Sequence, residues 1–142
     1  MGGLRYLLDT NIISELRKIE KNRADIRVVH WFSQVKMSQL YLSVISLAEI
    51  NIGILQLKRR DPEAAQTLQD WLNQRLLPDF AHRILPLDEV AAQLSARFHV
   101  PDRSPINDAY IAAIAQRYGC QLVTRNVRDF ERLALPLINP FA

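Results

Sequence analysis

The stretch Leu4-Arg5-Tyr6-Leu7-Leu8-Asp9-Thr10-Asn11 joins a short apolar run to three polar residues, and it decides the fold of the chain. The apolar run at residues 4–8 predicts a short buried strand. Residues 10–19 follow it with isoleucine and leucine at helical spacing, which predicts a helix. A strand that passes directly into a helix is typical of parallel sheets. Asp9 is therefore expected at the carboxyl end of a strand, where open parallel sheets bind their ligands.

The same order of strand and helix recurs along the rest of the chain. Short apolar runs predict further strands at residues 40–45, 84–87, 120–124 and 137–138. Helical periodicity predicts helices at residues 26–35, 46–57, 62–76, 88–98, 105–118 and 126–133. This alternation predicts an α/β fold, with a mainly parallel central sheet of four to five short strands and helices on both faces. We expect a single domain over residues 1–142, because the length fits one domain and no linker divides it.

Composition narrows the class of protein further. Hydrophobic residues make up 49% of the chain and charged residues 23%, which is typical of a globular protein. The single cysteine excludes an intramolecular disulfide and a cysteine-based zinc finger, and it favours a cytoplasmic location. The longest apolar stretch, residues 40–55, contains Glu49 and Asn51, so we expect no membrane partner.

Positive charge is concentrated in the first part of the chain. Residues 1–60 contain ten Lys or Arg and five Asp or Glu, whereas residues 61–142 contain eight and ten. The excess is either a set of solvated helix faces or a surface that attracts a polyanion. Charge alone favours the solvated faces.

Carboxylates gather where the predicted strands end. Asp9 follows the first strand, Glu49 lies in the helix after the second, and Asp108 lies in the helix before the fourth. Taken singly, Asp9 and Asp108 suit helix N-termini, Glu49 suits the capping box Ser46-Leu47-Ala48-Glu49, and Asp88 is interpreted as a helix N-cap. Taken together at one end of one sheet, Asp9, Glu49 and Asp108 would repel one another. A hard divalent cation such as Mg²⁺ or Mn²⁺ relieves this repulsion, and no paired histidines or cysteines favour zinc instead.

Four motifs around these acids resemble, in order and spacing, the PIN domains of VapC/FitB-type toxins from bacterial toxin–antitoxin modules. The motifs are Leu7-Leu8-Asp9-Thr10-Asn11; Ser46-Leu47-Ala48-Glu49 with Ile50-Asn51-Ile52-Gly53; Ile106-Asn107-Asp108-Ala109-Tyr110-Ile111-Ala112-Ala113; and Leu122-Val123-Thr124-Arg125-Asn126 with Asp129-Phe130. The resemblance covers essentially the whole chain. It implies that Asp9, Glu49 and Asp108 are the catalytic residues and the ligands of a Mg²⁺ or Mn²⁺ ion.

The resemblance also assigns neighbouring residues. Asn126 stands where many members carry a fourth acid, so it is the fourth expected metal ligand, one that adds no charge, and Asp129 is a weaker candidate. Asn11 and Thr124 match supporting polar positions that orient ligands or water. The amide at Asn126 leaves open whether one metal or two would bind.

The activity that the resemblance implies is metal-dependent endoribonuclease cleavage, in which water attacks an RNA phosphodiester and leaves a 5′-phosphate and a 3′-hydroxyl. Arg103 and Arg125 lie near the predicted acidic end and are candidates for substrate binding, although Arg125 suits an ion pair with one of the acids equally. The basic first half of the chain then has a partner in RNA phosphates.

Two protein partners are implied as well. One is a second copy, in a homodimer for which Trp31/Phe32 and Leu68/Trp71/Leu72 are candidate faces, unless these residues are simply core. The other is a small DNA-binding antitoxin.

Three other classes of protein would also account for acids at the end of a parallel sheet. A phosphorelay receiver needs a late lysine, and the chain has none after Lys58. A dehalogenase-type phosphatase needs a second aspartate where Asn11 stands. A non-catalytic PIN-type module, which acts with a DNA-binding antitoxin in a repressor complex, stays open because of Asn126.

Overall fold

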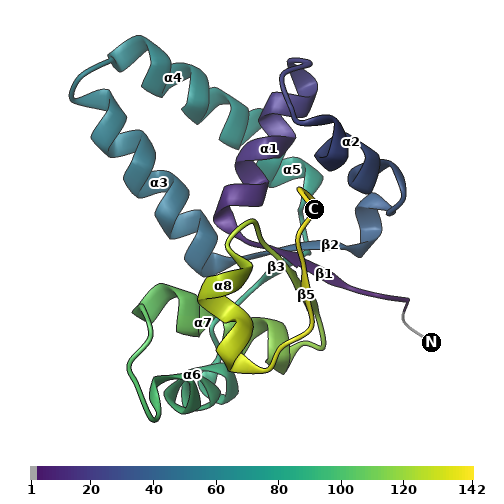
Figure 1. Ribbon diagram of the computed structural model, residues 1–142. Coiled ribbons are helices and arrows are strands. Elements are labelled where there is room, and N and C mark those ends of the chain that lie inside the picture. The colour runs from purple at the N-terminus through teal and green to yellow at the C-terminus, as the bar shows by residue number, and fades with distance from the viewer. Residues whose placement is uncertain (1–2) are drawn as a thin grey trace.

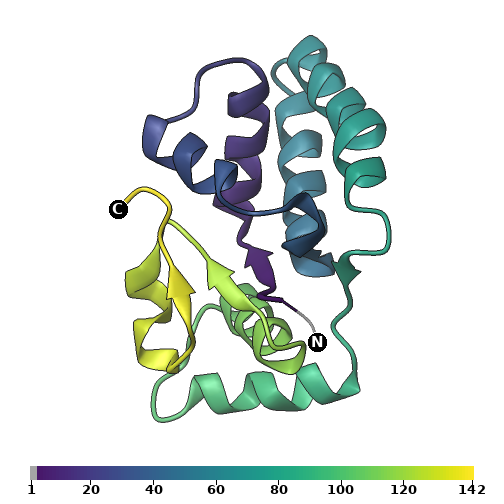
Figure 2. The same cartoon turned by 90° about the vertical axis from the view of Figure 1, so that its right-hand side faces the viewer.

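The computed structural model describes residues 3–142 as a parallel sheet with helices on both faces (Figures 1 and 2). Met1 and Gly2, which the predicted domain includes, lie outside the described residues. The strands are β1 (Tyr6–Leu8), β2 (Leu40–Ser43), β3 (Ile84–Leu85), β4 (Gln121–Val123) and β5 (Leu137–Ile138). They form one sheet in the order β3-β2-β1-β4-β5, and every neighbouring pair is parallel. The predicted α/β fold is confirmed.

The helices lie where the apolar periodicity predicts them. The α-helices are α1 (Thr10–Glu20), α2 (Ile26–Ser33), α3 (Val44–Lys58), α4 (Pro62–Trp71), α5 (Leu77–Asp79), α6 (Glu89–Ser95), α7 (Ile106–Arg117) and α8 (Val127–Phe130). Short helical turns extend three of them: the π-helical η2 (Leu72–Leu76), η3 (Ala96–His99) and η4 (Glu131–Leu133). A separate turn, η1 (Met37–Gln39), stands directly before β2. No helix in the described part of the chain is long and apolar enough to cross a membrane.

Alternating strand residues supply two separate cores, one on each face of the sheet. Tyr6 and Leu8 of β1 pack with α1, α3 and α4, whereas Leu7 between them packs with α6, α7 and α8. All three side chains are buried because β1 is the central strand and is covered on both faces. The two views show α1 to α5 on one side of the sheet and α6 to α8 on the other (Figures 1 and 2).

The capping box expected at Ser46 is wrong. β2 ends at Ser43, and Ser43 itself is the N-cap of α3, since its hydroxyl accepts a hydrogen bond of 3.1 Å from the backbone N–H of Ser46. The helix therefore begins two residues before the predicted start. Glu49 then lies in the second turn of α3, and its carboxylate has no capping role.

Asp88 is the N-cap of α6, as predicted, and its carboxylate also pairs with Arg117 at 3.1 Å. Trp31, Phe32, Leu68 and Trp71 are partly buried against the core on the α1 side of the sheet, and Leu72 is fully buried there. Leu72 is therefore core, whereas the other four residues of the candidate dimer faces pack against the core and keep part of their surface exposed.

Candidate active site

The site is built where β1, β2 and β4 end, because these three strands are neighbours and run in the same direction. Asp9 follows β1 directly and is the N-cap of α1. Its backbone N–H donates to the carbonyl of Val123 in β4, at 2.9 Å, which ties the two strand ends together. Thr124, the first residue after β4, is thereby placed beside Asp9.

The carboxylate of Asp9 is buried and held by neutral donors. One oxygen accepts the backbone N–H of Thr10 at 2.8 Å, and the other accepts the Thr124 hydroxyl at 2.8 Å and the Asn11 amide at 3.4 Å. Burial raises the pKa of Asp9 in spite of these bonds, and the charges of Glu49 and Asp129 raise it further. The supporting positions predicted at Asn11 and Thr124 thus contact Asp9 directly.

Glu49 is held from α1 by a chain of hydroxyl groups. The Thr10 hydroxyl lies 2.7 Å from Oε1 of Glu49 and 2.9 Å from Oγ of Ser46. Because a carboxylate only accepts, the single Thr10 proton goes to Glu49, and the buried Ser46 hydroxyl donates to Thr10. The Ser43 hydroxyl lies 3.4 Å from the Ser46 hydroxyl and extends this series of hydrogen-bonded hydroxyl groups. Thr10 and Ser46 were not predicted as site residues. Both are polar residues shortly after a predicted strand, which is the signal that could have identified them.

Asp108 faces the other acids from the first turn of α7. Burial, together with the charges of Asp9, Asp129 and Glu49, raises the pKa of Asp108 to about 6. The four carboxylates are therefore close enough to act on one another. Asp129, which the sequence favoured only weakly, acts on Asp9 and Asp108 together with Glu49.

Asn126 is connected to the site through its backbone. Its N–H donates to the Thr124 hydroxyl at 3.1 Å, and its exposed side chain makes no capping bond to α8. Asp129 lies one helical turn further along, and its backbone N–H donates to the Asn126 carbonyl at 3.0 Å.

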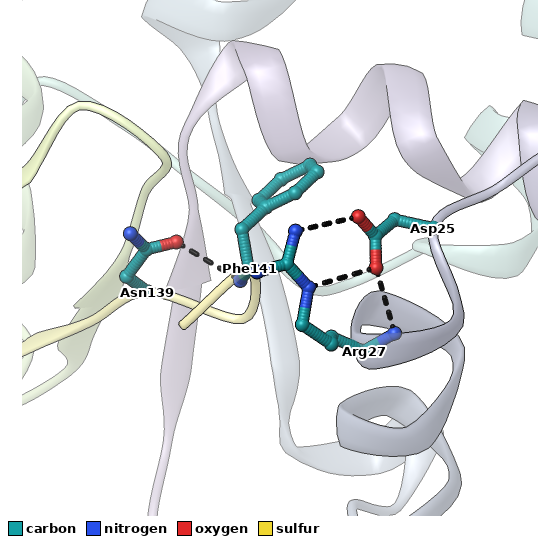
Figure 3. A network of polar contacts seen from close by, with 4 residues as sticks. All are labelled: Asp25, Arg27, Asn139 and Phe141. Carbon is teal, nitrogen blue, oxygen red and sulfur yellow. Dashed lines mark hydrogen bonds and ion pairs between the residues drawn. The ribbon is translucent and has the colours of Figure 1, made fainter.

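Arg125 forms no ion pair with the four site acids within residues 3–142, and its predicted role in substrate binding stays a prediction. Its backbone N–H donates to Oδ1 of Asn11 at 3.2 Å, and its guanidinium carbon lies 4.5 Å from the ring centroid of Phe141. Figure 3 shows the surroundings of Phe141: Asn139 accepts the Phe141 backbone N–H, and Arg27 holds the carboxylate of Asp25. Arg27, and to a smaller extent Arg125, hold the pKa of Asp25 at about 2.

The site acids differ from the paired acids elsewhere in residues 3–142. Lys18 pairs with Glu15, Arg27 with Asp25, Arg75 with Glu20, and Arg117 with Asp88. Within the same residues, no Lys or Arg forms an ion pair with Asp9, Glu49, Asp108 or Asp129. Arg103 is exposed and makes no such pair either. The gathered negative charge is left without a protein cation.

The donor chemistry fits a hard divalent cation. The available atoms are carboxylate, amide and hydroxyl oxygens, and the donors that hold Asp9 and Glu49 are neutral, so their charge is retained. Among residues 3–142, no three His, Cys, Asp or Glu side chains converge closely enough to surround an ion by themselves. Mg²⁺ keeps several of its waters when bound, so an ion at this site would be held partly through water.

The chain is similar to known proteins over nearly its whole length. The family model described as PIN domain matches residues 6–135. The chain is 34% identical to Toxin FitB of Neisseria gonorrhoeae over 95% of this chain and 97% of that protein, and 36% identical to VapC ribonuclease Y4jK of Sinorhizobium fredii over 95% and 96%. The crystal structure of FitAcB from Neisseria gonorrhoeae superposes with a TM-score of 0.85 at 33% identity, covering 96% of this chain and 98% of that one.

Replacing Asp108 by Asn should stabilise the metal-free protein at neutral pH. The raised pKa of Asp108 means that the folded chain holds the proton more tightly than the unfolded chain. The wild type should therefore lose stability as the pH rises from about 4 to about 6. Asp108 is only half-buried, so solvent screening limits the gain in Asp108→Asn at pH 7.5 to about 1 kcal/mol. Urea unfolding in EDTA at several pH values measures it, with exposed Asp102→Asn as control. Equal stability of wild type and Asp108→Asn would contradict the crowding of these acids.

Thr10→Val should lower the free energy of unfolding by about 1–2 kcal/mol, because Glu49 loses its donor and the buried Ser46 hydroxyl loses its acceptor. Thr10→Ser keeps the hydroxyl and should retain most of the stability. The same urea titration separates the two variants. If the valine and serine variants unfold alike, the hydroxyl chain does not hold Glu49.

Proposed function

This chain belongs to the PIN domain family, and from that premise we propose that it is a metal-dependent endoribonuclease, the toxin component of a toxin–antitoxin module. The observation that carries the proposal is the unpaired group of carboxylates at the N-cap of α1, in α3 and in α7, where burial and the charges of the neighbouring acids raise the pKa of Asp108 to about 6. The names of the similar proteins, a toxin and a VapC ribonuclease, support it.

Asp9, Glu49 and Asp108 would hold a Mg²⁺ or Mn²⁺ ion, with Asn126 as a fourth oxygen ligand and Asp129 as a weaker candidate. When bound, such an ion makes water more acidic and stabilises the negative charge that develops on the phosphodiester. Asn126 adds no charge, so we favour a single tightly held ion.

The side chains of the chain then have distinct tasks in hydrolysis. Thr124 and Asn11 orient the carboxylate of Asp9, and Thr10 orients that of Glu49. Asp108 or Glu49 is our candidate for orienting the attacking water or accepting its proton, because both carboxylates belong to the site that would hold that water. Attack by water leaves a 5′-phosphate and a 3′-hydroxyl.

Substrate contacts would come from two exposed cations, one directly after β4 and one shortly before α7. Arg125 is held against Phe141 at the end of β4, and exposed Arg103 lies shortly before α7. We propose that both contact RNA phosphates that flank the cleaved bond.

We propose a small DNA-binding antitoxin as the protein partner, and the similarity to the FitAcB structure supports it. A second copy of the chain is the other proposed partner. The face that suits it is on α3, where Ile52 and Leu55 are 52% and 64% exposed. RNA and an antitoxin as partners agree with a cytoplasmic location.

The proposed activity predicts cleavage of cellular RNA by purified, antitoxin-free protein in Mg²⁺ or Mn²⁺, and none in EDTA. Asp9→Asn removes a ligand and should lower the rate at least 100-fold, while the folded state persists because the donors around Asp9 are neutral. Asp102→Asn removes the same charge elsewhere and should cleave like the wild type. End-labelling of the products checks for 5′-phosphates.

Two outcomes would overturn this function. Cleavage that continues in EDTA would remove the role of the metal. Metal binding by the folded protein with no cleavage of any RNA in the pool would favour the non-catalytic module that acts with an antitoxin.

A further inference from the structure

A groove of about 590 Å³ begins at the acid site and runs along α1. Thr10 and Glu49, which belong to the site, also line one part of the groove. The remaining walls come from α1, α3 and α4, which lie on the same side of the sheet, with α1 and α3 side by side (Figures 1 and 2). A ligand in the groove is therefore continuous with a ligand at the acids.

The α1 wall of this groove is strongly basic. Arg17, Lys18, Lys21 and Arg23 all line it. Lys18 is paired with Glu15 at 3.0 Å, whereas Arg17, Lys21 and Arg23 form no ion pair within residues 3–142. From Thr10 to Lys21 an α-helix rises roughly 16 Å, so the cations are spread along a track and not gathered at one point.

The opposite wall offers apolar and aromatic surface. Trp71 and Leu68 of α4 line the groove, and Trp71 is only partly buried. Gly53 of α3 also lines it, and a Cβ atom added there would meet no atom within 4 Å. A glycine inside a helix costs about 1 kcal/mol relative to alanine, and here its effect is to keep the groove open.

We propose that this groove binds a single strand of RNA on one side of the cleaved phosphodiester, with its phosphates on Arg17, Lys21 and Arg23 and a base against Trp71. The inference rests on the proposed function, which puts a phosphodiester at the acids. A basic track beside an aromatic side chain is the combination that binds single strands without regard to sequence. RNA fits better than an acidic protein segment because the cations continue outward from the site where the phosphodiester must lie.

The first test measures binding without cleavage. A fluorescein-labelled single-stranded RNA is titrated with the full chain in EDTA, by anisotropy, from 50 to 200 mM salt. The variant Arg17→Gln/Lys21→Gln/Arg23→Gln should bind at least tenfold more weakly. The slope of log K against log salt should fall by about 2, since each lost phosphate contact on a single strand contributes about 0.7. The control Lys58→Gln/Arg59→Gln/Arg60→Gln removes the same charge between α3 and α4 and should bind within twofold of wild type.

A second variant tests the groove by filling it. Gly53→Leu should strengthen the helix and meet no clash, so the protein should stay folded, as a urea titration checks. It should nevertheless weaken RNA binding at least fivefold. Gly53→Ala, which adds a single methyl group, should bind within twofold of wild type.

Cleavage in Mg²⁺ separates this inference from the proposed function. If the groove variants have a raised KM and an unchanged kcat, the nuclease function and the groove inference are both supported. If the wild type cleaves RNA and the groove variants bind and cleave it equally well, the groove inference is overturned and the nuclease remains. If the wild type binds RNA through the groove and never cleaves, the function fails and the groove remains. If the groove variants bind RNA as the wild type does but no longer bind poly-glutamate, the groove binds an acidic protein segment and the inference is overturned.

Discussion

Repulsion among carboxylates at one edge of a parallel sheet is the constraint on which the rest of this structure depends. β1 lies between β2 and β4, so the residues that end these strands share a small volume. Burial and like charge raise the pKa of both Asp9 and Asp108, which means that the folded chain pays for keeping them ionised at neutral pH. A site of this kind gains stability when positive charge arrives from outside the chain.

The groups that hold the site acids are all uncharged. Hydroxyl and amide donors orient Asp9 and Glu49, and they fix direction without cancelling charge. The ion-paired acids of residues 3–142 lie elsewhere, and Asp88 with Arg117 is an example in which pairing serves a helix N-terminus. A guanidinium among these carboxylates would lower their pKa values and would remove the demand of the site for a cation.

The sequence was sufficient for the elements that depend on local pattern. Short apolar runs predict all five strands, and the central strand β1 is apolar and buried throughout because both of its faces are covered. Asp9, Glu49 and Asp108 could be found because strand ends of a parallel sheet share an edge. The start of α3 could not, since both Ser43 and Ser46 are good capping residues and only the end of β2 decides between them. The stacking of Arg125 on Phe141 and the approach of Asp129 to Asp108 depend on how the last helices pack, which no local pattern records.

The hydrogen bond between Asp9 and Thr124 spans 115 positions of the chain, and it has a consequence for synthesis. The central strand is the first to be made, yet its neighbour β4 leaves the ribosome long after α1 and α3. Until then β1 has an unpaired edge, and the Asp9 carboxylate lacks the Thr124 hydroxyl, which is one of its three donors. The nascent chain therefore contains Asp9 and Glu49 for most of translation while the site is still incomplete. Because β4 is the late neighbour of β1, the site can form only after Thr124 has been synthesised.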